Sequence, residues 1–105
     1  VREHYFLMAS FAKIDEDGTV LAVYVVANEA MMEDGVENPQ LGIDLLNGIE
    51  PGEYIQTSYN DRIRANFATQ GGVYRRDLDA FVPPKPLWGE FQLNESKVKW
   101  EPVDE

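Results

Sequence analysis

The residues of this sequence best suited to hold a ligand are four arginines set among aromatic side chains. They fall within fifteen positions, and the group consists of Arg62, Arg64, Arg75 and Arg76 with Tyr59, Phe67 and Tyr74. Interleaved basic and aromatic side chains can hold a nucleotide by charge and by stacking. The alternative is that these arginines pair with acids of the same chain. The formal net charge of −10 favours the alternative, because it repels phosphate.

Carboxylate chemistry is the second candidate, because nineteen residues are acidic. Two opposed carboxylates can hydrolyse a glycoside, but chance alone places many acids together in such a sequence. The run Asp15-Glu16-Asp17-Gly18 also resembles part of a calcium-binding loop. Placing Gly18 at the glycine of such a loop puts Lys13 at its first ligand and Tyr24 at its bidentate glutamate, so the ligand set fails. The run predicts a tight turn.

Other catalytic groups are scarce. The sequence has no cysteine and one histidine, His4. Thiolate metal sites and thiol nucleophiles are therefore excluded, and a histidine site would need carboxylates from elsewhere. Gln70-Gly71-Gly72 is followed by Val and Tyr rather than by the Lys and Ser or Thr of a phosphate-binding loop. We expect no enzymatic activity, no cofactor and no metal.

Two apolar segments around the acidic turn predict a β-hairpin, over residues 5–14 and 19–27. The second segment is rich in β-branched residues and apolar on both of its alternating faces. It therefore predicts a central strand that is covered on each side. Aspartate at Val23 or Val25 is then expected to unfold the domain, because it would bury an unpaired charge.

One helix is expected after residue 38. Asn38-Pro39 is typical of a helix start, because Asn accepts from free amides of the first turn and Pro has none to leave unpaired. Apolar residues at helical spacing predict the face that packs on the sheet, namely Leu41, Leu45, Leu46 and Ile49. Gly48 or Pro51-Gly52 ends the run. The acidic residues 28–38 before it indicate a short helix or an irregular crossover.

The second half of the chain again predicts strands, over residues 53–59, 73–76 and 80–82. The run Pro83-Pro84-Lys85-Pro86 ends sheet pairing. It is either a polyproline II ligand for an aromatic groove or, as we favour, a stiff connector. A last hairpin is expected to pair residues 88–93 with 98–102, with Leu93 opposite Val98 and Phe91 opposite Trp100.

These elements predict one α+β domain, with a mostly antiparallel sheet of five to seven short strands, one packed helix and a C-terminal aromatic hairpin. The domain is expected over residues 8–105, and residues 1–7 are expected to be an N-terminal extension. The longest apolar run, residues 20–27, is far shorter than a membrane-spanning helix. We expect no membrane association and no secretory signal peptide.

Several strings resemble small proteins of marine tailed bacteriophages, cyanophages among them. The strings are residues 10–13 before the acidic turn, 54–60 (Tyr-Ile-Gln-Thr-Ser-Tyr-Asn), 64–68 (Arg-Ala-Asn-Phe-Ala), 79–86 (Asp-Ala-Phe-Val-Pro-Pro-Lys-Pro) and 100–102 (Trp-Glu-Pro). The likeness runs from about residue 8 to 102 and departs at residues 87–90. Such phage proteins are mostly uncharacterised, and some are named virion structural proteins. The resemblance implies a place in the virion or the host cytoplasm and offers no established catalytic residues to carry over.

The expected function is therefore that of a non-enzymatic, phage-encoded accessory or virion-associated structural protein that acts through protein contacts. Eight of the twelve aromatic residues lie between residues 54 and 100, which indicates self-association or docking on a protein partner. The candidate surface consists of Tyr59, Arg62, Arg64, Tyr74, Lys85 and Trp88. Two alternatives stay open, an acidic DNA mimic that inhibits a host enzyme and a small carboxylate-based hydrolase or ligand-binding module. Direct binding to a nucleic-acid backbone is not expected at this charge.

Overall fold

Three antiparallel strands form the centre of the fold in this computed structural model, which describes residues 8–58 and 63–103. They lie in the order β2 (Val20–Ala27), β1 (Met8–Ile14), β5 (Glu53–Thr57). The expected hairpin is confirmed, because β1 pairs with β2 along its whole length. The expected N-terminal extension lies outside the described residues.

The expectation that residues 19–27 form the central strand is wrong. The central strand is β1, which has Phe11 and Ala12 fully buried on its two faces, whereas β2 lies at the sheet edge with Val25 58% exposed. Both strands have apolar residues on two faces, and the pairing of β1 with β5, more than 35 positions along the chain, decides which is central. Val25→Asp is therefore no longer expected to unfold the domain.

Helix α1 spans Pro39–Ile49 and begins as the sequence predicts. The Asn38 side chain accepts a hydrogen bond from the Gln40 amide at 3.1 Å, and Pro39 opens the first turn. At the other end Glu50 is extended, with φ −145°, since the residue before Pro51 disfavours helical geometry.

The face that α1 buries agrees only in part with the predicted one, because Leu41 and Leu46 pack on the core and the other two predicted residues do not. Gly42 and Leu46 are buried, whereas Leu45 is 45% and Ile49 74% exposed. A Cβ at Gly42 would lie 2.9 Å from both Met31 Sδ and Phe11 Cζ. The helix therefore approaches the sheet most closely at Gly42, and this contact line turns Leu45 and Ile49 outward.

Between β2 and α1 the chain forms a 3-10 turn, η2 (Asn28–Met31), and a small hairpin of β3 (Met32–Glu33) and β4 (Val36–Glu37). The sequence interpretation missed this hairpin. Asp34 and Gly35 both have positive φ, 55° and 79°, as the tight turn of a two-residue hairpin loop requires.

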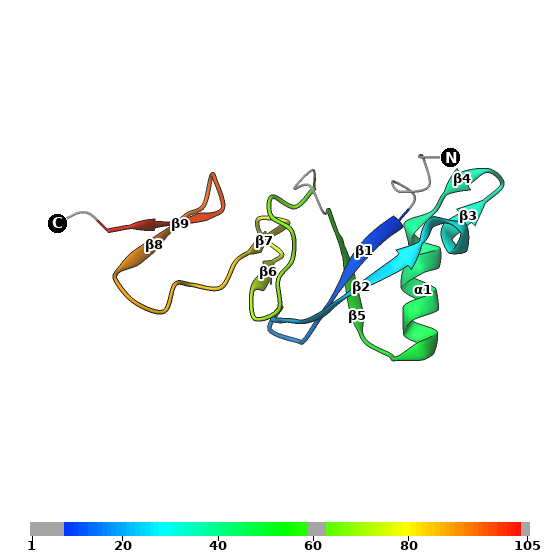
Figure 1. Cartoon of the computed structure of the whole chain (residues 1–105), viewed down its shortest axis with the longest axis horizontal. Helices are drawn as coiled ribbons and strands as arrows, with labels where there is room; N and C mark the ends of the chain where they lie inside the picture. The colour runs from blue at the N-terminus through cyan, green and yellow to red at the C-terminus, as the bar shows by residue number, and fades with distance from the viewer. Residues whose placement is uncertain (1–7, 59–62, 104–105) are drawn as a thin grey trace.

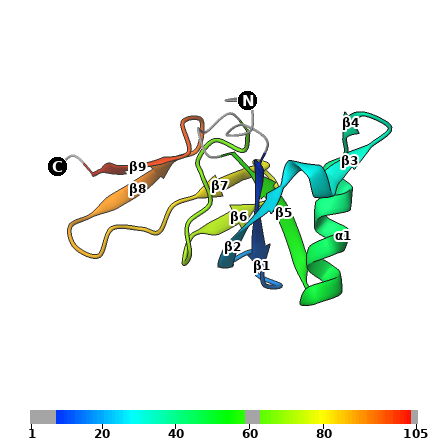
Figure 2. The ribbon, with the colours of Figure 1, turned by 45° about the vertical axis from the view of Figure 1, so that its right-hand side comes forward.

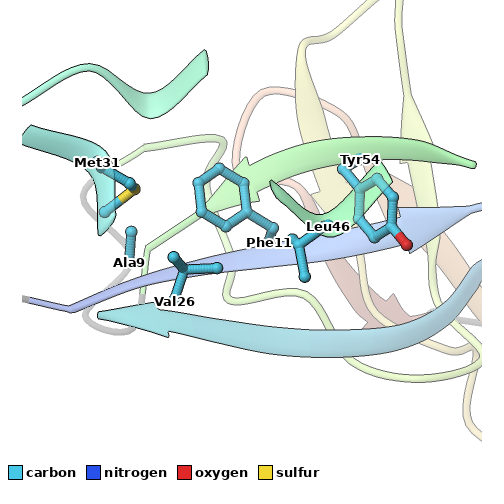
Figure 3. Packing of buried hydrophobic residues seen from close by; sticks show 6 residues of the cluster. All are labelled: Ala9, Phe11, Val26, Met31, Leu46 and Tyr54. Atoms are coloured by element: carbon cyan, nitrogen blue, oxygen red, sulfur yellow. The ribbon is translucent and has the colours of Figure 1, made fainter. Parts of the chain in front are cut away.

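A core cluster fills the space between α1 and the sheet (Figure 3), and it consists of Ala9, Phe11, Val26, Met31, Leu46 and Tyr54. Tyr54 is buried, and its hydroxyl donates to the Glu50 carbonyl at 2.6 Å, which ties the end of α1 to β5. Burial raises the pKa of this phenol.

The opposite face of the sheet is covered by β6 (Val73–Arg75) and β7 (Ala80–Val82), which pair antiparallel. Phe81 is buried there against Ala12, Ile14, Val20 and Ala68. The Tyr74 amide donates to the Gly18 carbonyl at 2.7 Å and so fixes this layer to the β1–β2 turn. The sheet therefore lies between a helix and a second, two-stranded layer.

The C-terminal hairpin pairs β8 (Phe91–Asn94) with β9 (Lys99–Pro102). The predicted register is wrong by two residues, since Leu93 lies opposite Trp100 rather than Val98. Val98 leaves the strand with φ 53° and is buried against Ala80 and Val82, so the turn holds four residues. The predicted start at Trp88 is also too early.

The α+β class is confirmed, with mostly antiparallel strands and one helix in the described residues. The described residues hold seven strands of three or more residues and the two-residue pair β3–β4. They do not form the single sheet that was expected, because they are divided into one three-stranded sheet and three two-stranded sheets. The molecule measures 56 × 31 × 22 Å, and hairpin β8–β9 lies at one end of the long axis and α1 at the other (Figures 1 and 2). No helix in the described ranges is long and apolar enough to cross a membrane.

Candidate interaction surface

Asp79 joins two residues of the predicted surface. Its Oδ1 accepts a hydrogen bond from the Tyr74 hydroxyl at 2.5 Å and one from Arg64 Nε at 3.0 Å. A second nitrogen of Arg64, Nη1, donates to the Gln56 carbonyl at 3.2 Å. Arg64 therefore links the β6–β7 turn to β5, Tyr74 fixes Asp79 within that layer, and the polar groups of both residues are engaged within the chain.

The electrostatics of this group follow from its contacts. The hydrogen bond from Tyr74 and the charge of Arg64 lower the pKa of Asp79 below its usual value. Burial, together with Asp79, raises the pKa of Tyr74. The tyrosine ring packs on Phe81, with the ring centroids 5.2 Å apart. Asp79 is therefore a charged acceptor that orients two side chains at the edge of the core.

The lowered pKa predicts that Asp79 contributes to acid sensitivity. A carboxylate whose pKa is lower in the folded than in the unfolded state stabilises the fold above the unfolded value, near 4, and this contribution is lost as the pH falls through the folded pKa. The melting temperature of the Asp79→Asn variant should therefore fall by a smaller amount between pH 7 and pH 3 than that of the wild type. An unchanged drop would contradict this role. Asp17→Asn, at an exposed turn position, is the matched control.

The remaining described arginines are also paired with acids. Arg75 Nη2 lies 2.5 Å from Asp77 Oδ2 and Nη1 lies 3.0 Å from Glu95 Oε2. Arg76 Nη2 lies 2.6 Å from Glu53 Oε2, and its guanidinium carbon is 5.9 Å from the Tyr74 ring centroid. The interpretation that the arginines pair with acids of the same chain is confirmed for the three that the structure describes. Arg62 and Tyr59 lie outside the described residues.

Lys85 lies in the connection between β7 and β8. Its Nζ is 5.7 Å from the centroid of the Trp100 ring, a cation–π contact. The Trp100 indole Nε1 donates to the Pro83 carbonyl at 2.8 Å. Residues 83–86 therefore lie beside hairpin β8–β9 and are attached to it by these two contacts, which agrees with the stiff connector expected from the sequence.

Trp88 follows in the same connection and is 80% exposed, and Leu87 before it is 92% exposed. Gly89 then takes φ 82°, a conformation that favours glycine. We call Leu87 and Trp88 the apolar loop pair. Sequence reasoning selected Trp88 and missed Leu87, although its place between a proline run and a glycine was a usable signal.

The contacts divide the predicted surface in two. Arg64 and Tyr74 belong to the group around Asp79, whereas Lys85 and Trp88 lie in the loop before β8. Within residues 8–58 and 63–103 no group of three or more His, Cys, Asp or Glu side chains could hold a metal ion. Arg64, Tyr74 and Lys85 are thus held by contacts within the chain, whereas the apolar loop pair is exposed.

Comparison of the chain with protein-family models, with curated proteins and with solved structures finds no match, and thus no enzyme family.

Proposed function

We propose that this chain is a non-catalytic, phage-encoded accessory or virion-associated structural protein, and that it acts through protein contacts made by the apolar loop pair. One observation carries the proposal. Leu87 and Trp88, next to each other in the chain, are the most exposed of the large hydrophobic side chains in the described residues, at 92% and 80%, ahead of Ile49 at 74%.

The energetics of such a pair support a contact function. Covering an aliphatic or aromatic side chain contributes about 1.5–3 kcal/mol through the hydrophobic effect. Tryptophan is also among the residues that most often dominate the binding energy of an interface. Neither residue contributes much of this to folding, because both stay exposed in the folded chain. The free energy gained by covering these two side chains is therefore still available when a partner binds.

The backbone around the pair supports the same conclusion. Pro86 precedes it and restricts φ, Gly89 follows it in a left-handed conformation, and the proline run is anchored through Trp100. A loop that is already restrained loses less conformational entropy when it binds. Arg64, Arg75 and Arg76, in contrast, are occupied by internal ion pairs, which lowers the support for nucleotide binding.

The two tryptophans provide a matched pair of variants. Trp88→Ala should change the free energy of unfolding by about 0.5 kcal/mol or less, as expected for an exposed position. Trp100→Ala should cost about 2 kcal/mol, because it removes a half-buried ring and the hydrogen bond to Pro83. Thermal melts compare them directly. A Trp88→Ala variant as unstable as Trp100→Ala would place Trp88 in the core and contradict its contact role.

The function itself is tested in virions of the phage that encodes the protein. Quantitative mass spectrometry should find the protein in purified virions, and a folded Trp88→Ala variant should be incorporated less.

A further inference from the structure

Strand β2 forms one edge of the three-stranded sheet, and most of this edge is open. At its start the edge is already paired. The Val20 amide donates to the Gly72 carbonyl at 2.8 Å, and the Gly71 amide donates to the Val20 carbonyl at 3.0 Å. Thr19 forms an antiparallel bridge with Val73 beside them. Beyond residue 20, no strand of the described residues other than β1 pairs with β2.

The backbone groups of Val23 and Val25 point out of the open edge. At the opposite edge of the sheet the Gln56 carbonyl accepts from an arginine side chain and therefore points away from β1. Gln56 lies opposite Phe11, so the backbone groups of Phe11 point the other way, toward Tyr24. Backbone groups alternate in direction along a strand, so those on either side of Tyr24 point outward. In the described part of the chain nothing hydrogen-bonds to them.

The sequence of β2 does not protect this edge against pairing. Edge strands are commonly protected by lysine, proline or a bulge. The run Val20–Ala27 contains no charged residue, no proline and no glycine, and its register shift lies at its start. The side chains of Leu21 and Val25 are 44% and 58% exposed. An added strand would therefore cover apolar side chains and satisfy the free backbone groups, as in strand addition to a sheet edge.

The surroundings of the open edge are acidic. Residues 8–57 hold ten acidic residues and one basic residue, Lys13, which is paired with Glu50. Glu16 and Asp17 are exposed before the start of β2, and Glu29 is exposed after its end. These three make no ion pair within the described residues, and the arginines at the end of β6 are bound to other acids. Both ends of the edge therefore attract basic residues.

We propose that the open edge of β2 binds an extended segment of another protein, with apolar residues at its centre and basic residues at both ends, as an added antiparallel strand. A second copy of this chain fits less well. Antiparallel pairing of β2 with β2 places Glu16 and Asp17 beside Glu29 of the other copy, and parallel pairing places like ends together. Both arrangements oppose acids, which is destabilising. The site shares no residue with the apolar loop pair and is independent of it.

Amide hydrogen exchange measured by NMR tests the proposal on the wild-type protein. The probe is the synthetic peptide Lys-Lys-Thr-Val-Thr-Val-Thr-Val-Lys-Lys, and its control has glutamate in place of every lysine. The lysine peptide should slow exchange at the amides of Val23 and Val25, and it should leave the amide of Tyr24, which already faces β1, unchanged. The glutamate peptide should bind about tenfold more weakly, and added salt should reduce this difference.

Two variants at residue 25 test the backbone contact. Val25→Pro removes the outward amide, and proline is tolerated at edge positions whose amide faces solvent. Val25→Thr keeps the amide and the branched shape and is the matched control. Circular dichroism melts check that both fold. Val25→Pro should weaken binding of the lysine peptide by about tenfold, since it removes a hydrogen bond and obstructs pairing, and Val25→Thr should bind as the wild type does.

Three results would overturn the proposal. Unchanged exchange at Val23 and Val25 at the highest soluble concentration of the lysine peptide would show that the edge accepts no strand, whether or not Val25→Pro folds. Equal affinity for the two peptides would show that the acidic surroundings do not select a basic segment. A wild-type dimer in sedimentation equilibrium that Val25→Pro dissociates would assign the edge to a second copy.

Discussion

Replacing Phe11 by alanine should lower the free energy of unfolding by about 3–5 kcal/mol, a large part of the stability of a domain of this size. Phe11 is fully buried in the central strand, and its ring lies against Met31 and the backbone of α1 at Gly42. The variant loses both the transfer energy of the ring and the packing of the helix on the sheet. Equilibrium unfolding in urea measures the loss.

Val25→Ala is the matched control, because Val25 lies in the neighbouring strand and is 58% exposed. We expect a loss of about 0.5 kcal/mol or less at this surface position. Equal losses at the two positions would show that Val25 is as well covered as Phe11 and would contradict the edge position of β2. The comparison therefore tests the sheet order β2-β1-β5 directly.

The second large effect is expected at Asn66, whose amide nitrogen bridges two layers. Its Nδ2 donates to the Phe81 carbonyl at 3.0 Å and to the Val98 carbonyl at 2.8 Å. Asn66→Ala removes both donors and should cost about 2–3 kcal/mol. Val98 is held at φ 53°, which is costly for a β-branched residue, so hairpin β8–β9 should also detach more readily. Faster amide hydrogen exchange in β9 would report this.

Asn94→Ala is the comparison for Asn66. The Asn94 side chain accepts from the Ser96 and Lys97 amides, and its Nδ2 donates to Glu101 Oε2 at 3.1 Å, so its contacts stay within its own hairpin. We expect about 1 kcal/mol for this loss. If Asn66→Ala costs no more than Asn94→Ala, Asn66 does not connect the hairpin to the rest of the fold.

Features that depend on local chemistry could be predicted from the sequence. The start of α1 at Asn38-Pro39, the turn at residues 15–18 and the end of the sheet at the proline run all follow from backbone preferences of a few neighbouring residues. These preferences do not depend on where the rest of the chain lies.

Features decided by distant contacts could not be predicted. The central place of β1 depends on pairing with β5, and the buried face of α1 depends on the fit of Gly42 against Phe11 and Met31. The register of β8–β9 depends on Val98, which packs on Ala80 and Val82 instead of continuing its strand. Hydrophobic periodicity is read within one segment of the sequence, so it does not show which distant segment a residue will contact.

The candidate surface shows the same division. The pairing of arginines with acids was anticipated from the net charge, but the role of Asp79 as a common acceptor depends on a fold that brings residues 64, 74 and 79 together. Exposure of Trp88 and Leu87 depends on the absence of a covering element, which sequence alone does not establish. The many aromatic residues in the second half of the chain therefore pointed to Trp88 as a candidate contact residue, but they gave no indication of Leu87 beside it.

We propose that this protein belongs to the virion and is retained there through its apolar loop pair. The most direct test of this proposal is the copy number of the protein in purified virions, measured by quantitative mass spectrometry for the wild type and for the Leu87→Ser, Trp88→Ser variant. We expect a fixed copy number per virion for the wild type and a strongly reduced one for the variant. A wild-type protein that is abundant in infected cells and absent from virions would contradict it.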